Sequence, residues 1–138
     1  MKIVSEKLEK IIHSSIRTIL VTGESGTGKE TVVNTLESLL PPSVPVVKVN
    51  CAAITPSLIE SELFGHIKGS FTGALKDRRG YFEAANNGWL FLDELTSLPL
   101  TAQASLLRAI ENQEISRVGE TTTRKINVVV KTIIKGWP

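Results

Sequence analysis

Short apolar runs alternate with amphipathic segments along this chain. The apolar runs predict four buried strands, at residues 16–22, 44–50, 89–92 and 128–134. Apolar residues at three- and four-residue spacing predict helices at 2–14, 28–40, 55–64, 81–85 and 99–112. Because strands that alternate with helices form crossover connections, the pattern predicts an α/β fold of three layers, in which helices cover both faces of a mainly parallel sheet.

Local signals refine this layout. Pro41 and Pro42 are expected to end the second helix, because proline cannot continue it. The stripe of the last helix that is expected to face the core is Leu100, Ala104, Leu107 and Ile110. Residues 65–76 contain three glycines without periodicity and predict a loop or loose hairpin, and residues 114–118 and 123–126 predict a hairpin.

The first predicted strand leads directly into a glycine-rich turn, Gly-Glu-Ser-Gly-Thr-Gly-Lys-Glu, and a helical pattern follows. Such a turn can point several backbone N–H groups at one anion, and the helix adds the positive end of its dipole. We therefore predict a phosphate cradle for a nucleoside triphosphate, formed by Gly23, Glu24, Ser25, Gly26, Thr27, Gly28, Lys29 and Glu30. A chance match in an ordinary turn is the alternative, and Glu30 departs from the usual Ser or Thr.

Two acids follow the third predicted strand. Ligands of such sheets bind at the carboxyl ends of the strands, so Asp93 and Glu94 are expected beside the glycine-rich turn. Asp93 can hold Mg²⁺ next to the phosphates, and Glu94 can orient and polarise the attacking water. The alternative is that both acids cap N–H groups at the start of a turn or helix.

Composition indicates a single soluble domain of 138 residues, with 41% hydrophobic and 22% charged residues. The net charge is +2 and no dense run of Lys and Arg occurs, so any DNA contact is expected in a domain outside this chain. The single cysteine, Cys51, is expected to be a small buried side chain in a reducing cytoplasm. Neither a membrane span nor a signal peptide is predicted.

These motifs together resemble the AAA+ central domain of bacterial sigma-54-dependent transcriptional activators (enhancer-binding proteins). Glu30 after Lys29 matches that family's Walker A form, and residues 88–94 resemble its Walker B strand. Residues 60–66, Glu-Ser-Glu-Leu-Phe-Gly-His, are a further match. The most specific mark is similar to the family's GAFTGA signature, with serine in place of the first alanine: Gly69, Ser70, Phe71, Thr72, Gly73 and Ala74.

The resemblance implies the N-terminal α/β part of an AAA+ sigma-54 interaction ATPase domain over residues 1–138, with ATP and Mg²⁺ as cofactors. It implies that the 69–74 loop contacts sigma-54 RNA polymerase holoenzyme through Phe71 and Thr72; from spacing alone, Phe71 tucked into the core is the alternative. It implies that Asn50 pairs with Glu94 and couples hydrolysis to the loop; a simple turn asparagine is the alternative. Ring assembly, a two-component response regulator and a separate DNA-binding domain are further implications.

The likeness ends after residue 130, where the family has an Ala-Thr-Asn-type segment, arginine fingers and a helical lid. This chain instead reads Lys131-Thr132-Ile133-Ile134-Lys135. Because an arginine finger can be worth ~10³–10⁵ in rate, weak or undetectable ATP turnover is expected from this chain alone. The chain is expected to be either a fragment or a degenerate member of the family. Two functions are considered: an ATPase core that remodels sigma-54 polymerase, or a non-catalytic module that binds nucleotide or sigma factor. The 69–74 loop disfavours a third possibility, another P-loop nucleotidase or kinase.

Overall fold

The computed structural model describes residues 18–23, 34–35 and 37–135, with side chains at 34–35 and 37–132. The helix predicted at 2–14, the first part of the helix predicted from residue 28, and turn residues 24–30 lie outside these residues. The described part of the second helix, at 34–35 and 37–39, ends before Pro41 as predicted.

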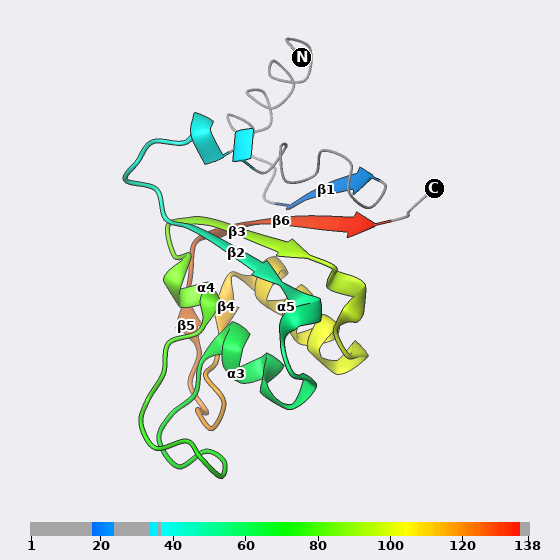
Figure 1. Cartoon of the computed structure of the whole chain (residues 1–138). Helices are drawn as coiled ribbons and strands as arrows, with labels where there is room; N and C mark the ends of the chain where they lie inside the picture. Colours follow the sequence, from blue (N-terminus) through cyan, green and yellow to red (C-terminus); the bar gives the residue numbers. More distant parts are fainter. Residues whose placement is uncertain (1–17, 24–33, 36, 136–138) are drawn as a thin grey trace.

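In the part of the chain that the structure describes, four parallel strands form the central sheet (Figure 1). They are β1 (Thr18–Gly23), β2 (Val46–Asn50), β3 (Gly88–Asp93) and β6 (Val128–Lys135). The spatial order is β1-β6-β3-β2, so the last of these strands in the chain lies between the first and the third. The four predicted strands are confirmed, with ends that shift by at most two residues.

The helical segments follow the predicted order. They are α3 (Ile59–Phe64), α4 (Tyr81–Ala84) and α5 (Leu100–Asn112). The pattern did not predict three single 3₁₀ turns: η1 (Cys51–Ala53), η2 (Pro56–Leu58) and η3 (Leu95–Ser97). The helix predicted at 55–64 therefore begins as η2, with Pro56 as its first residue, and continues as α3.

The core lies between the sheet and α3, α4 and α5, which are all on the same side of the sheet in Figure 1. Leu90 and Leu92 of β3 point into this core and are fully buried. Trp89 and Phe91 alternate with them and so face the opposite side of the sheet, where they are also buried. Both faces of β3 are therefore covered, as expected for a central strand of an α/β fold.

The buried face of α5 differs from the prediction. The α5 side chains buried in the core are Ala102, Leu106 and Ala109. Leu100 and Leu107 are instead 81% and 55% exposed, Ala104 is also exposed, and only Ile110 of the predicted stripe is partly buried. The prediction was wrong because the helix carries two apolar stripes at helical spacing. The stripe with two alanines is the one that allows the helix to approach the sheet closely.

Two loops lie together at the lower end of the molecule in Figure 1. His66 bridges Arg78 on one side and Val118 on the other, which joins the loop after α3 to the segment after α5. The predicted loop at 65–76 is confirmed, because no helix or strand forms there. The predicted hairpin is also confirmed, with shorter antiparallel strands β4 (Glu114–Ile115) and β5 (Arg124–Lys125).

Candidate functional site

The carboxyl ends of the parallel strands bring three of the predicted site residues, Gly23, Asn50 and Asp93, to one edge of the sheet. Asn50, the last residue of β2, pairs in register with Asp93, the last residue of β3. Asp93 pairs with Ile133 of β6, which pairs with Val21 of β1, and Gly23 ends β1 two residues further on. At about 4.8 Å between neighbouring strands, β1 and β3 are ~10 Å apart. The end of β1 and the acid pair therefore share this edge.

Asp93 has a carboxylate oxygen that is buried without a partner. Its Oδ1 makes no hydrogen bond to any described residue. A buried unpaired carboxylate oxygen is costly, so the position favours a cation or a hydrogen-bond donor. The described residues contain no group of three His, Cys, Asp or Glu side chains that could hold a metal. Mg²⁺ at nucleotides needs only one or two carboxylates, because phosphates and water complete its coordination. Asp93 therefore fits such an ion.

The backbone turns sharply at Glu94. This residue has a left-handed conformation, with φ 57° and ψ 47°, which costs a non-glycine residue roughly 1–2 kcal/mol. Its side chain does not cap the following η3, contrary to the capping alternative, although its carbonyl oxygen accepts the Ser97 N–H at 2.9 Å. Strained residues are concentrated at functional sites, so the conformation supports a functional position for Glu94. No sequence signal indicates this strain.

Asn50 caps the turn that follows β2. Its Oδ1 accepts the Ala52 N–H at 3.0 Å, which is the arrangement expected of a turn asparagine. The cap uses only the acceptor end of the amide. Nδ2, the donor end, is the one that a pair with Glu94 requires. The two interpretations of Asn50 are therefore compatible, and its pairing with Glu94 stays a prediction.

Cys51 lies next to the acid pair. Its side chain is 1% exposed, which confirms the expected small buried residue. Burial, followed by the negative charges of Asp93 and Glu94, raises the pKa of the Cys51 thiol to about 11. The thiol is therefore neutral at physiological pH and does not compete with the carboxylates for a cation.

Only the first residue of the predicted cradle is described. Gly23 is the last residue of β1, and its backbone pairs with that of Lys135. Glu24, Ser25, Gly26, Thr27, Gly28, Lys29 and Glu30 lie outside the described residues. The cradle stays a prediction, supported by the position at which β1 ends.

Residues 69–74 form the predicted partner-binding loop, and backbone hydrogen bonds between its two ends, which we call its neck, close it. The Gly69 N–H donates to the Ala74 carbonyl oxygen at 2.8 Å, and the Ala74 N–H donates to that of Phe71 at 3.0 Å. Phe71 is 38% exposed, and its ring packs edge-on against His66 with 5.0 Å between the ring centroids. His66 is in turn fixed by Ser61, whose Oγ lies 2.6 Å from Nδ1. Phe71 is thus held at the surface on a fixed support and is not tucked into the core.

Ser70 places a hydroxyl in a buried position without a partner. Its Oγ forms no hydrogen bond to any described residue. We expect Ser70→Ala to raise the free energy of unfolding by about 1 kcal/mol, because the change removes an unsatisfied polar group and very little volume. Urea denaturation measures the effect, and Thr72→Ala at the exposed tip is a control expected to stay within about 0.5 kcal/mol. A loss of stability in Ser70→Ala would mean that the hydroxyl is hydrogen-bonded.

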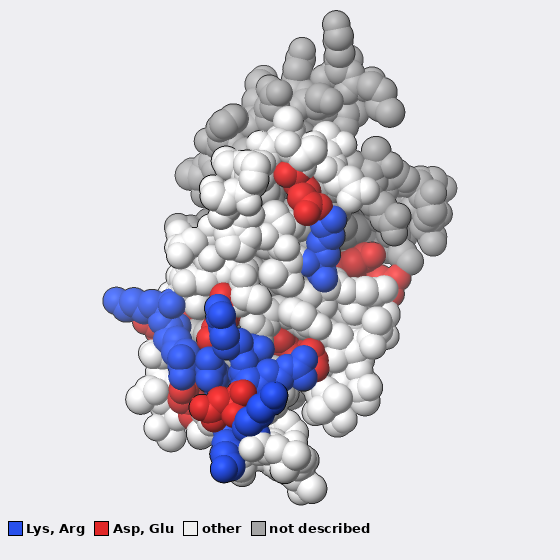
Figure 2. All heavy atoms as spheres, turned by 60° about the vertical axis from the view of Figure 1, so that its left-hand side comes forward, with Lys and Arg blue, Asp and Glu red and all other residues white. Residues whose placement is uncertain are grey.

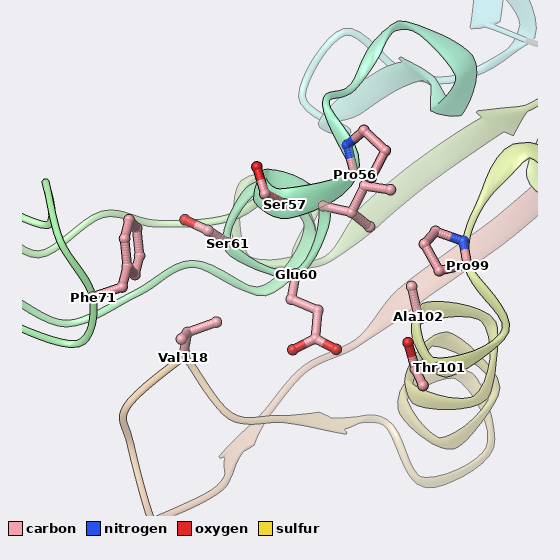
Figure 3. A pocket seen from close by; sticks show the side chains of 10 residues that line it. Pro56, Ser57, Glu60, Ser61, Phe71, Pro99, Thr101, Ala102 and Val118 are labelled. Carbon is pink, nitrogen blue, oxygen red and sulfur yellow. The ribbon is translucent and has the colours of Figure 1, made fainter.

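A pocket of about 260 Å³ lies behind this loop (Figure 3). Phe71 and Val118 line its loop side, and Thr101 and Ala102 of α5 line the other. The Glu60 carboxylate points into the space between them. Neither of the two acids at the sheet edge lines the pocket, and its volume is below the ~300–1,000 Å³ of most ligand sites. The pocket is therefore separate from the candidate nucleotide site.

The strand order and the acids at the carboxyl edge define the class of protein: an α/β domain of the AAA+ type, with a mainly parallel sheet and flanking helices. The comparisons with known proteins identify the family within that class. The chain belongs to the family described as the Sigma-54 interaction domain, which matches residues 1–135.

Curated relatives and solved structures agree with this assignment. The chain is 51% identical over 121 residues to the DNA-binding transcriptional activator HyfR of Escherichia coli K12, covering 87% of this chain and 18% of HyfR. It is 48% identical over 122 residues to the anaerobic nitric oxide reductase transcription regulator NorR of Escherichia fergusonii, covering 88% of this chain and 24% of NorR. A crystal structure of NtrX from Brucella abortus superposes with a TM-score of 0.85 at 32% identity, covering 99% of this chain and 30% of NtrX. The chain thus spans less than a third of each of these proteins.

Proposed function

We propose that this chain is the ATP-binding core of a sigma-54-dependent transcriptional regulator, which couples ATP hydrolysis to remodelling of sigma-54 RNA polymerase. The observation that carries the proposal is the convergence of Gly23, Asn50 and Asp93 on one edge of the sheet, together with the unpartnered Asp93 oxygen. Family membership supports it, as do the regulator names of HyfR and NorR and the NtrX crystal structures in complex with ADP and with ATP.

Each residue has a role in this proposal. The backbone of residues 23–30 cradles the phosphates, and Lys29 reaches the outer ones. The Asp93 carboxylate would hold Mg²⁺, which when bound neutralises charge on the phosphate oxygens. The Glu94 carboxylate orients the attacking water and accepts its proton. Because the Asn50 oxygen is fixed by the Ala52 N–H, the amide is held in one orientation, and its nitrogen would donate to Glu94.

The loop at 69–74 is the proposed contact with sigma-54 RNA polymerase. Phe71 is supported from below by His66, and Thr72 and Gly73 are exposed beside it. A partly exposed aromatic on a loop suits recognition of a protein partner. Residues 1–138 would form the N-terminal α/β part of the domain, and ring assembly and a separate DNA-binding domain are proposed for the whole protein. None of the helices in the described residues has the length and hydrophobicity needed to cross a bilayer.

Nucleotide binding is tested with a fluorescent ATP analogue titrated into the purified chain. We expect Lys29→Ala to weaken binding at least about tenfold, because the lysine charge on the outer phosphates is lost. The matched control is Lys76→Ala, which removes an exposed lysine from the loop region and is expected to leave affinity unchanged. Equal affinity of Lys29→Ala and the unaltered chain would refute the cradle.

Phosphate release by the same samples then separates the two hypotheses. Turnover that Glu94→Gln abolishes indicates an ATPase core, and binding without turnover indicates a non-catalytic module.

A further inference from the structure

Lys and Arg side chains gather on one face of the molecule, next to the partner-binding loop (Figure 2). We call this the basic face; its exposed members are Lys68, Lys76, Arg78, Arg79, Arg124 and Lys125. They come from three segments that the backbone holds together. The His66 N–H donates to the Arg78 carbonyl oxygen at 3.0 Å, and the Ile67 N–H donates to that of Val118 at 3.1 Å. The backbone of the segments that carry the basic face is therefore fixed by hydrogen bonds between them.

The acids that pair with the exposed arginines of this region lie deeper than their partners. The side chains of Arg78 and Arg79 are 52% and 68% exposed, but their partners Glu62 and Glu83 are only 16% and 13% exposed. The same holds for Arg124, which is 42% exposed above Glu120 at 13%. Each carboxylate thus holds a guanidinium in place from below, and the outermost charges are positive.

A partly buried ion pair connects the segments that lie beneath the basic face. Arg117 and Glu83, only 10% and 13% exposed, form two hydrogen bonds at 2.7 and 2.9 Å. The hydrogen bonds from Arg117 hold the pKa of Glu83 below its ordinary value, so this carboxylate stays charged at neutral pH. The pair joins α4 to the segment between β4 and β5, and both carry residues of the basic face or of its supports.

Three lysines of the basic face form no salt bridge among the described residues, although Lys125 lies across the β4–β5 hairpin from Glu114. Lys68, Lys76 and Lys125 have no carboxylate within salt-bridge distance among the described residues. Asp77 is the exposed acid of this surface, and its Oδ1 accepts the backbone N–H of Lys68 at 2.7 Å. Lys68 and Lys76 lie on either side of the neck of the partner-binding loop. Positive charge therefore borders the surface that the proposed function assigns to RNA polymerase.

We propose that the basic face binds the phosphate backbone of duplex DNA. Spread cations without an apolar centre are what the evenly charged DNA backbone requires. A protein partner would need apolar or aromatic anchors at the centre of the patch, and Leu75 is the one large apolar side chain fully displayed among these residues. The proposal goes beyond the nucleotide site and locates a DNA contact within this chain. The sequence-based expectation placed any DNA contact in another domain.

Fluorescence anisotropy of a fluorescein-labelled 20-base-pair duplex of arbitrary sequence tests the proposal with the whole chain. We expect binding in 50 mM KCl that weakens at least about tenfold in 200 mM KCl, because bound cations release counterions. The variant Lys68→Gln/Lys76→Gln/Lys125→Gln removes three charges and no ion pair, and is expected to lose about tenfold or more in affinity. Its slope of log affinity against log salt should be smaller by up to about three. Absence of binding in 50 mM KCl would overturn the proposal.

Two controls separate this result from other causes. Lys48→Gln removes an exposed lysine that is paired with Glu37 away from the basic face, and it is expected to bind DNA as the unaltered chain does. Lys29→Ala is expected to keep DNA binding even where nucleotide binding is lost, so the two proposals fail independently. Circular dichroism melts verify that each variant folds. If a polyglutamate peptide displaced the duplex at much lower concentration than unlabelled DNA, the surface would belong to an acidic protein partner and the proposal would be wrong.

Discussion

Gly65→Ala is expected to destabilise the domain by about 4 kcal/mol or more, enough to prevent folding of a marginal domain. Gly65 ends α3 with φ 83° and ψ 177°, a region that only glycine enters readily. A Cβ added there would lie 2.5 Å from the Arg78 carbonyl oxygen and 2.8 Å from the Gly80 nitrogen. Both are backbone atoms that cannot rotate away, so the backbone at Gly65 and the segment at residues 78–80 would have to separate.

The matched control for this variant is Gly69→Ala. Gly69 has nearly the same φ, 81°, but a Cβ there would meet nothing within 4 Å. We expect it to cost only the backbone strain, about 1–2 kcal/mol. Urea denaturation followed by circular dichroism measures both variants, and the difference between them isolates the collision. Equal losses in the two variants would mean that the backbones near Gly65 and Gly80 do not approach closely.

The same close approach positions the functional loop. The Gly65–Gly80 contact and the His66–Arg78 bridge close the loop at its base, and the 69–74 tip projects from it. His66 then supports the ring of Phe71, so the orientation of the tip depends on the packing at the base. The backbone contacts of the glycines therefore set the position of the surface that a partner of the tip would bind. The sequence pattern indicates this region only as irregular structure.

The sheet and its acid pair were predictable because burial on both faces produces continuous apolar runs. Trp89-Leu90-Phe91-Leu92 is apolar on both faces, so it is recognisable as a buried strand. The polar residues that follow it must then lie at the carboxyl edge of the sheet. The register that places Asn50 level with Asp93 was not predictable, since it depends on how separate strands pair in space. The left-handed backbone of Glu94 is likewise set by its surroundings.

Features that depend on contacts between distant segments could not be predicted. The α5 sequence offers two apolar stripes, and only the packing decides that Leu106 is buried and Leu107 exposed. Arg117 and Glu83 are 34 residues apart, and no local pattern joins them. The net charge of +2 also conceals the basic face, because a sum over the sequence counts a recessed carboxylate and an exposed guanidinium equally.

A second large effect is expected at Lys131, a lysine in the middle of β6. Lys131 is 0% exposed, and its Nζ lies 4.6 Å from the ring centroid of Trp89, on the face of the sheet opposite α5. Burial lowers the pKa of Lys131 from 10.5 to about 8, so the folded state disfavours the charged amine. Burying the charged amine therefore costs stability, and the cation–π contact with Trp89, worth about 0.5–2 kcal/mol, offsets part of that cost.

Lys131→Met is therefore expected to stabilise the domain by about 2 kcal/mol at pH 7. Methionine has a similar length and flexibility and fills the space without a charge. Chemical denaturation measures the change, and Lys125→Met is the control because that lysine is exposed on β5. It is expected to change the free energy of unfolding by less than about 0.5 kcal/mol. Destabilisation by Lys131→Met would mean that the charged lysine contributes favourably to the sheet.

The pH dependence of this gain identifies its cause. Below pH 8, Lys131 is protonated in both the folded and the unfolded chain, and the full cost of burying its charge is present. As the pH rises from 8 to 10.5, the folded chain releases the proton first, so the unfolded chain binds more protons and stability rises. The advantage of Lys131→Met should therefore shrink by about 1 kcal/mol between pH 7 and pH 9. The Cys51 thiol, with its pKa near 11, acts in the opposite sense above pH 9, but it is present in both chains and cancels in the comparison. A constant advantage across this range would assign the gain to packing and not to the buried charge.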